Sequence, residues 1–509
     1  MVFRLYLLGL LFIDEIDRIM IRSISFYTGL IYCWFMGLMA CDEAIPTARP
    51  TDEAARLFPD YTEVTIPTNI APLNFRLENP HTAAYALLSV GDKQVRVKER
   101  KGQFTIPPAD WKKLIGEAGG QTLTIQLFAQ DAEWLAFPAC SLHIAPEPID
   151  PYIAYRLIEP GYELWNQMGI YQRALGDYTQ TPIMENKYSD QNCMNCHSFC
   201  MQNPDRFLFH MRDKHAGTYL IQGDKIEKLN TKTDQTLSAL VYPSWHPSGR
   251  FVAFSVNQTQ QSFHANDKNR VEVFDKASDV VVYDVQRHEV VTCAQLSQTG
   301  AFETFPTFSP DGRTLYFCTA EAQTMPVDFK QVKYNLCSIG FDPEQRSFSS
   351  QVDTLYSAGK GGLSASFPRV SPDGRWLLYT LSGYGNFSIW HKDADLYLAD
   401  LQTKASVPLT VANSDDVESY HSWSSNSRWI VFSSRRLDGL YTRPFFAYVD
   451  AEGKVAKPFL LPQADTDYYL RLMKSYNIPE FITGEVKNRI RSFSQIAKED
   501  PGINVRFAQ

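Results

Sequence analysis

Residues Phe305 to Cys318 read FPTFSPDGRTLYFC, and three further segments repeat this pattern. They are YPSWHPSGRFVAFS from Tyr242, FPRVSPDGRWLLYT from Phe367 and YHSWSSNSRWIVFS from Tyr420. Each segment places an aromatic residue before a turn made of Pro, Asp, Gly, Ser or Asn, and an apolar strand follows the turn. Gly and Asn accept the positive φ that such turns need. The pattern therefore predicts a strand, a turn and a second strand in each repeat.

A second hairpin follows each repeat and ends in Asp. The four hairpins contain VVVYD, CSIGFD, LYLAD and FAYVD, which end at Asp284, Asp342, Asp400 and Asp450. Four strands per repeat are typical of one blade of a β-propeller. The motifs resemble the repeat of TolB-like (WD40-like) propellers, and this resemblance implies an all-β fold with six blades. Five or seven blades stay open.

Two degenerate blades can be placed upstream of the four clear repeats. NPDRFLFHMR from Asn203 matches the turn and strand of the repeat, and GTYLIQGDKIEKL from Gly217 supplies a second hairpin. YIAYRLIEP from Tyr152 and GIYQRALGDYTQTPIMEN from Gly169 are interpreted as another first strand and outer hairpin. The propeller is therefore predicted to span residues 150–462, and six blades would close a ring without exposed edges.

The segments on either side of the propeller have distinct compositions. Residues 42–60 are rich in Pro, Ala and acidic side chains and predict a tether. Residues 61–149 alternate apolar and polar residues in short runs, which predicts a β-sandwich similar to an immunoglobulin-like or fibronectin-like spacer module, with one helix at 108–117. Residues 463–509 are predicted to form a short helical tail that packs on the propeller.

The N-terminal segment predicts export and lipidation. From Met20 the chain reads MIRSISFYTGLIYCWFMGLMAC, in which Arg22 precedes an apolar run that ends in small residues. This is a signal-peptide layout, and the final LMAC resembles a bacterial lipobox. The resemblance implies that residues 1–41 hold the signal, that Cys41 carries the lipid and that the protein lies in the cell envelope, facing the periplasm or the surface side of the outer membrane. Acidic residues within 1–19 favour a start at Met20. The alternative is a transmembrane helix.

Cys193-Met194-Asn195-Cys196-His197 is a C-x-x-C-H sequence, the attachment signature of c-type haem. In cytochromes of this type the two cysteines form thioethers and the adjacent histidine binds the iron, so the motif predicts Cys193, Cys196 and His197 as haem ligands. Haem c is attached outside the cytoplasm, which agrees with export. Candidates for a distal ligand are Met194, Met201, Met211 and His210.

The same motif has a structural interpretation. Cys196-His197-Ser198-Phe199 aligns on Tyr420-His421-Ser422-Trp423, so His197 would fill a blade position held elsewhere by Pro243, Pro306, Pro368 and His421. A disulfide among Cys193, Cys196 and Cys200 would then be plausible in an oxidising envelope. A metal site on these cysteines is a further alternative, although a clear fourth ligand for zinc is lacking.

Charge and motifs narrow the function classes. The net charge of -8 argues against a nucleic-acid partner, which would require a basic face. The sequence contains no G-x-S-x-G, H-E-x-x-H or P-loop motif, so catalysis is not expected. Asp311 and Asp373 fit turn positions where Asp bonds its own backbone. Two functions stay open: a haem protein that transfers electrons, and a non-enzymatic scaffold that binds a protein or glycan partner and uses its cysteines structurally.

Overall fold

The computed structural model describes residues 47–159 and 167–508 of the 509-residue chain. The predicted signal sequence with Met20, the predicted lipobox with Cys41 and residues 42–46 of the predicted tether lie outside the described residues. From Arg49 onward the chain forms one compact unit. Strands make up 47% of the residues and helices 9%, so the predicted mostly-β class is confirmed. No helix in the described part is both long and apolar enough to cross a membrane.

The N-terminal module contains a seven-stranded sheet and a separate strand pair. The pair consists of β2 (Leu57–Phe58) and β4 (Arg76–Leu77). The large sheet consists of β1 (Arg49–Pro50), β3 (Thr65–Ile66), β5 (Ala83–Val90), β6 (Lys93–Lys98), β7 (Thr122–Gln130), β8 (Trp134–Ala136) and β9 (Cys140–Ile144). Its β content agrees with the prediction, but an immunoglobulin-like topology is not confirmed.

The core of this module is formed by every second side chain of its strands and by one helix. Buried residues alternate with less buried ones along β5 and β7, because successive side chains of a strand point to opposite faces. The helix predicted at 108–117 is present as α2 (Pro108–Ile115). It buries Trp111 and Leu114, and the Trp111 Nε1–H donates to the Ile70 carbonyl at 2.9 Å.

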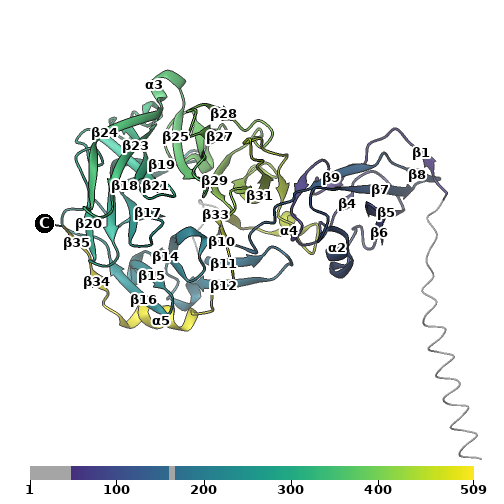
Figure 1. The fold of residues 1–509 in the computed structure, drawn as a ribbon, viewed down its shortest axis with the longest axis horizontal. Coiled ribbons are helices and arrows are strands. Elements are labelled where there is room, and N and C mark those ends of the chain that lie inside the picture. Colours follow the sequence, from purple (N-terminus) through teal and green to yellow (C-terminus); the bar gives the residue numbers. More distant parts are fainter. Residues whose placement is uncertain (1–46, 160–166, 509) are drawn as a thin grey trace, which may run out of the picture. The chain divides into compact units, whose positions relative to one another are not determined.

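Four propeller sheets are hydrogen-bonded separately, and they stand around a common axis in Figure 1. The first holds β12 (Gln180–Glu185), β11 (Gly169–Ala174), β10 (Tyr152–Ile158) and β33 (Ser475–Ile482), in that order. The second holds β13 (Met194–Phe199), β14 (Arg206–Met211), β15 (Gly217–Gln222), β16 (Lys225–Asn230) and β34 (Ile503–Asn504). The other two hold β25 (Ser364–Val370), β26 (Trp376–Ser382), β27 (Asp395–Asp400) and β28 (Ser406–Pro408), and β29 (Glu418–Trp423), β30 (Trp429–Ser434), β31 (Arg443–Tyr448) and β32 (Phe459–Leu460).

The remaining propeller strands belong to one nine-stranded sheet. Its members are β17 (Val241–Trp245), β18 (Phe251–Phe263), β19 (Val271–Asp284), β20 (Glu289–Val291), β21 (Ala301–Phe308), β22 (Thr314–Glu321), β23 (Asn335–Asp342), β24 (Ser347–Tyr356) and β35 (Arg506–Phe507). A single residue pair, Ser278 with Phe302, links β19 to β21. Four blades are thus found as separate sheets, in place of the six expected.

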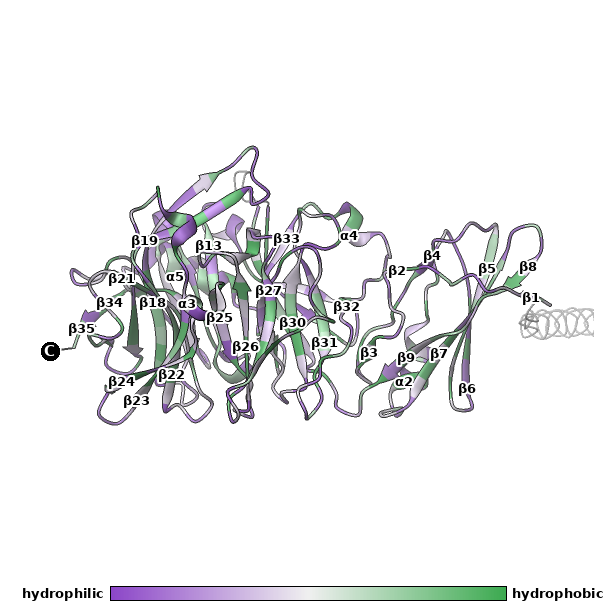
Figure 2. Cartoon of the chain, turned by 90° about the horizontal axis from the view of Figure 1, so that it is seen from above, coloured by the Kyte–Doolittle hydropathy of each residue, from purple (hydrophilic) through white to green (hydrophobic). Residues whose placement is uncertain are grey.

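Six strands line the axis of the propeller. Neighbouring members contact one another in a closed ring, in the order β13, β17, β21, β25, β29, β33 and back to β13. Each of the six shows a break in its pairing register, which marks a β-bulge at the same position of the repeat. Strand interiors are hydrophobic and the turns between strands are largely hydrophilic, as Figure 2 shows.

The C-terminal segment differs from the prediction of a helical tail. It contains two helices, α4 (Tyr468–Arg471) and α5 (Ile490–Glu499), but also β33, β34 and β35. Strand β33 is the innermost strand of the first sheet and pairs antiparallel with β10. The interpretation of Tyr152 as the start of an innermost strand is therefore wrong, because β10 is the second strand. The propeller also extends beyond residue 462, since the chain returns to complete this sheet.

Short elements complete the chain. The helix α3 (Ala358–Gly361) leads into β25. Five 3₁₀ turns are η1 (Asn186–Tyr188), η2 (Cys200–Gln202), η3 (Asp213–His215), η4 (Phe329–Gln331) and η5 (Ser388–Trp390). The turn η2 connects β13 to β14 at one end of the axis, where it contacts β17 and β33.

Candidate functional site

The bulge of each inner strand projects one residue toward the axis. These residues have a φ between +48° and +52°, a range that side chains other than Gly rarely adopt and that a bulge in the strand permits. We call them the plug ring: Cys196, Tyr242, Phe305, Phe367, Tyr420 and Ile478. The Phe305 and Phe367 rings lie 3.9 Å apart, and Tyr242 packs edge-on against Phe305 at 4.7 Å. The plug ring leaves a cavity of about 20 Å³.

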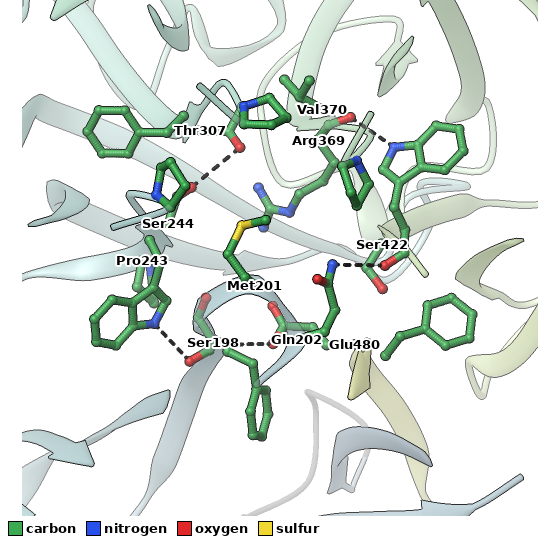
Figure 3. A pocket seen from close by; sticks show the side chains of 18 of the residues that line it. Ser198, Met201, Gln202, Pro243, Ser244, Thr307, Arg369, Val370, Ser422 and Glu480 are labelled. Carbon is green, nitrogen blue, oxygen red and sulfur yellow. Dashed lines mark hydrogen bonds between the residues drawn. The ribbon is translucent and has the colours of Figure 1, made fainter. Parts of the chain in front are cut away.

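Two residues further along each inner strand, the side chains are mostly polar. We call these residues the mouth ring: Ser198, Ser244, Thr307, Arg369, Ser422 and Glu480. They line a cavity of about 120 Å³, to which all six inner strands contribute. Figure 3 shows Arg369 and Met201 reaching toward the middle of this cavity from opposite sides.

Tryptophans of the repeat hold the mouth ring in place. The Trp245 Nε1–H donates to the Ser198 carbonyl at 3.1 Å, and the Trp423 Nε1–H donates to the Arg369 carbonyl at 3.1 Å. In both cases the acceptor belongs to the preceding inner strand. These bonds join neighbouring inner strands through an indole side chain and a backbone carbonyl. Within the mouth ring, the Ser244 hydroxyl donates to Thr307 Oγ1 at 3.4 Å, and the Ser422 hydroxyl donates to the Pro479 carbonyl at 2.9 Å.

Arg369 and Glu480 are the two ionisable members of the mouth ring. The Arg369 Nη1–H donates to the Pro368 carbonyl at 2.9 Å, and within the described residues the guanidinium forms no ion pair. Burial raises the pKa of Glu480 to about 8, although the charge of Arg369 acts in the opposite direction. The Phe199 N–H donates to Glu480 Oε2 at 3.2 Å. At neutral pH Glu480 is therefore mostly protonated, and the charge of Arg369 is left unbalanced.

The turn η2 supplies a strained, apolar element at the mouth. Met201 and Gln202 both have a positive φ, of 48° and 55°. Two successive non-glycine residues in this region are costly and persist only when surrounding contacts hold them. The Gln202 Nε2–H donates to the Trp423 carbonyl at 3.3 Å, and the Thr483 N–H donates to the Gln202 carbonyl at 2.9 Å. Met201 is 46% exposed, so an apolar side chain is presented at the cavity.

The residues of the C-x-x-C-H motif diverge in the structure. Cys196 belongs to the plug ring, and His197 lies buried beside it. Cys193 packs against a different apolar cluster, alongside Ile158 and Ile226. Cys193, Cys196 and Cys200 are unbridged, and no group of three His, Cys, Asp or Glu side chains within the described residues is placed to hold a metal ion.

His197 and His421 occupy equivalent positions in the propeller. Burial lowers the pKa of both imidazoles to about 3, so each is neutral at pH 7. The backbone of Ala154 and Ile478 partly offsets this lowering of the His197 pKa. The backbone of Leu378 and Phe367 has the same effect on the pKa of His421. The geometry differs slightly: His421 Nε2 lies 3.1 Å from the Leu378 carbonyl oxygen, whereas neither ring nitrogen of His197 has a hydrogen-bond partner.

A haem does not fit the arrangement of these residues. The cavity beside Cys196 and His197, about 20 Å³, accommodates a water molecule, whereas pockets for ligands of drug size measure roughly 300–1,000 Å³. Cys193 does not line this cavity. The unpartnered nitrogens of His197 alone would suit a metal, but the plug-ring side chains fill the space that a macrocycle would need.

The comparisons with known proteins give distant structural likenesses. No family model and no curated protein matches the chain. A solved puromycin hydrolase is 12% identical with a TM-score of 0.36, and the match covers 61% of this chain and 45% of that one. A puromycin-hydrolyzing peptidase of Mycobacterium tuberculosis is 13% identical, TM-score 0.34, with 79% and 57% covered. A putative 6-phosphogluconolactonase from Bacteroides uniformis is 10% identical, TM-score 0.30, with 75% and 97% covered. The propeller-like arrangement is carried by the sheets of the described residues and by the closed ring of six inner strands.

Sequence reasoning missed the two ionisable members of the mouth ring. A signal was available, because aligning the repeats places Arg369 and Glu480 where the other inner strands carry Ser or Thr. Glu480 is harder to recognise from the sequence, because the segment IPEF from Ile478 lacks the turn and the strand that follow the other copies of the repeat. Asp311 and Asp373 accept bonds from the backbone N–H groups of Arg313 and Arg375, at 3.0 and 3.1 Å, as expected for turn residues.

Proposed function

We propose that this chain is an exported, lipid-anchored envelope protein whose TolB-like propeller binds a segment of a partner protein at the mouth ring. One observation carries the binding role: the guanidinium of Arg369 forms no ion pair within the described residues and faces a cavity to which all six inner strands contribute. The site is concave and combines converging polar side chains with apolar walls, which are features of ligand pockets.

We further infer that six blades surround the axis. The nine-stranded sheet has two inner strands, β17 and β21, and only the pair of Ser278 with Phe302 joins its halves. Counting each half as one blade gives one inner strand for every blade. The return of β33 to pair with β10 gives the first sheet an inner strand from the C-terminal part of the chain and completes the circle of six inner strands.

Binding without haem is the function that the geometry supports better. The covalent haem at Cys193, Cys196 and His197 stays a prediction from the motif. Its test is production of the protein in a host that matures c-type cytochromes. We expect a protein mass without a haem increment; a haem increment together with a c-type absorption spectrum would show that the plug ring rearranges around the cofactor.

The proposed lipidation of Cys41 would place the protein in the envelope, and Cys41→Ala tests it. We expect the native chain to fractionate with membranes and to incorporate a labelled fatty acid, since the acyl chains of a lipidated cysteine anchor a protein stably. The variant should lose the label and move to the soluble fraction. A variant that remains in the membrane fraction without label would instead indicate a spanning helix.

A site-specific crosslink tests the binding role. A photoreactive amino acid replaces Met201 at the mouth, and in a control protein it replaces the exposed Gln345 in the turn between β23 and β24. We expect a discrete protein adduct from position 201 and none from position 345. Equal adducts from both positions, or none from 201, would overturn the proposal. An adduct that is removed by glycosidases and not by proteases would point to a glycan partner instead.

A further inference from the structure

We propose that the mouth ring recognises a carboxylate group, which the guanidinium of Arg369 binds. This inference rests on the proposed binding function and names the chemistry of its ligand. The carboxylate would come from the C-terminal end of an extended peptide or from a small organic acid. Both sources present the same planar group to the arginine.

The hydrogen-bonding capacity of Arg369 is largely unused. A guanidinium has five N–H donors, and within the described residues this side chain donates one hydrogen bond, to the neighbouring Pro368 carbonyl. The side chain reaches into the mouth cavity in Figure 3 and is half-buried. A planar carboxylate accepts two parallel bonds from such a fork, and partial exclusion of water strengthens them.

The other groups around Arg369 leave its charge unopposed. The mouth ring otherwise offers hydroxyls at Ser198, Ser244, Thr307 and Ser422 and a carboxyl group at Glu480. Burial holds the pKa of Glu480 near 8, so at pH 7 the group is mostly neutral and can donate a hydrogen bond. The ionisable groups beneath Arg369 are also neutral there: the His421 imidazole, the Cys318 thiol and, across the cavity, the His197 imidazole.

The walls of the cavity limit the size of the ligand. Apolar side chains surround the polar ring, namely Phe199, Trp245, Phe308, Trp423, Phe481 and the prolines of three turns. The volume of about 120 Å³ is slightly smaller than a cavity of about 150 Å³ that accepts benzene. The carboxylate would therefore carry one apolar group of at most that size inside the cavity, with the remainder of the ligand outside and near Met201.

Titration calorimetry on the full chain in detergent tests this proposal with matched probes. The small acid 3-phenylpropionate is compared with 3-phenylpropionamide, and the peptide acetyl-Ala-Phe with its C-terminal amide. We expect at least one acid to bind more tightly than its amide. Binding of the peptide acid alone would identify a peptide end as the source, and binding of 3-phenylpropionate alone would identify a small organic acid.

Three variants locate the binding group. Arg369→Gln should weaken acid binding about 10- to 100-fold, the range expected when a charged hydrogen-bonded pair is lost. Arg369→Lys keeps the charge but not the planar fork, and should give an intermediate loss while preserving the melting temperature. Arg375→Gln is the control, because Arg375 lies in the following turn and pairs with Asp400 outside the cavity. It should leave the affinity unchanged.

Two results would overturn the proposal: no acid binds at millimolar concentration, or the acids bind native protein and Arg369→Gln equally. Failure of the proposed function looks different. If the crosslink from position 201 persists in Arg369→Gln, the partner binds the mouth without a carboxylate. If the acids bind through Arg369 but no partner adduct forms, the carboxylate site stands and the partner-binding role fails.

Discussion

The plug ring and the mouth ring come from the same six strands, only two residues apart, yet they differ in almost every property. The plug ring is nearly all apolar, and its aromatic members pack against one another, with Phe305, Phe367 and Tyr420 buried. The mouth ring is polar, partly open to solvent and carries the unpaired Arg369. The same strand geometry, repeated six times, thus provides a packed apolar layer. Two residues further along each strand it provides a polar layer whose residue types differ from strand to strand.

This difference separates stability from binding. Substitutions in the plug ring should act on the free energy of unfolding, because burial of aromatic side chains supplies most of their effect. Substitutions in the mouth ring should act on ligand affinity and leave unfolding almost unchanged. The following predictions are ordered by the size of the effect that would break or sharpen this comparison.

Removal of β33 should have the largest effect. Truncation after Lys474 deletes the strand that carries Ile478 and Glu480 and that buries Tyr476, Phe481 and Ile482. Each large side chain contributes about 1.5–3 kcal/mol on burial, so the total approaches the 5–15 kcal/mol that stabilises a typical domain. We expect loss of the cooperative thermal transition in circular dichroism.

The matched control for this truncation ends the chain after Pro501. It removes only β34 and β35, which pair with the outer strands β16 and β20. This protein should keep a cooperative transition with a lower midpoint. If both truncated proteins unfold alike, β33 is not the strand that closes the ring.

A single substitution in the plug ring should have the next largest effect. Phe305→Ala removes a ring that is 1% exposed and packs against Tyr242 and Phe367, and it should lower the free energy of unfolding by about 3–5 kcal/mol. Thr307→Ala, two residues along the same strand, should cost less than about 1.5 kcal/mol, the typical net contribution of one hydrogen bond. Urea unfolding measures both. Similar losses at the two positions would contradict the division between the rings.

The two buried histidines should show a pH-dependent effect of intermediate size. The folded-state pKa of His197 and His421, about 3, lies below the unfolded value of about 6.5, so the unfolded state binds more protons in acid. Stability is full above pH 6.5 and falls as the pH drops toward 3, by about 3 kcal/mol per histidine between pH 7 and pH 4.

Proline variants test this and the haem motif together. His421→Pro and His197→Pro introduce the residue that four other inner strands carry at the same position. Each variant should therefore unfold at a lower pH than the native protein, and by the same amount. Acid unfolding curves that shift only for His421→Pro would show that His197 has a role beyond filling the blade position.

The smallest expected effect concerns the pH dependence of carboxylate binding. Above pH 8 Glu480 ionises, and its charge then competes with the ligand for Arg369. The affinity for an acid probe should fall several-fold, at most about 10-fold, between pH 7 and pH 9, and Glu480→Gln should remove this dependence. An affinity that rises with pH, or an unchanged dependence in Glu480→Gln, would show that another group controls the charge at the mouth.

Much of the fold could be predicted because the repeat combines local signals. The turn residues at Asp311 and Asp373 and the alternating strands after them have physical causes that act within a few residues. Strand β33 was not predicted, because its partner β10 lies more than 300 residues away in the sequence and its own segment lacks the turn of the repeat. The function of Arg369 could not be read locally either, since it depends on which neighbours fail to pair with it in space.

The C-x-x-C-H motif teaches a related lesson. Its chemistry requires the two cysteines and the histidine to converge on one cofactor, and the spacing of the motif does not by itself determine how the three side chains are directed. On strand β13 the bulge at Cys196 turns that side chain to the axis, while Cys193 packs into another cluster. The alignment of His197 with His421 in the repeat agrees with the structure, in which both imidazoles are buried at equivalent positions.

A crystal structure of the full chain with a bound acid probe tests the central claim most directly. The account predicts that the probe's carboxylate lies in the mouth cavity with both oxygens about 2.7–2.9 Å from Arg369 guanidinium nitrogens, and with its apolar group between Trp245 and Trp423. A probe bound elsewhere, such as in the groove between β24 and β28, with the mouth cavity free of ligand, would contradict it.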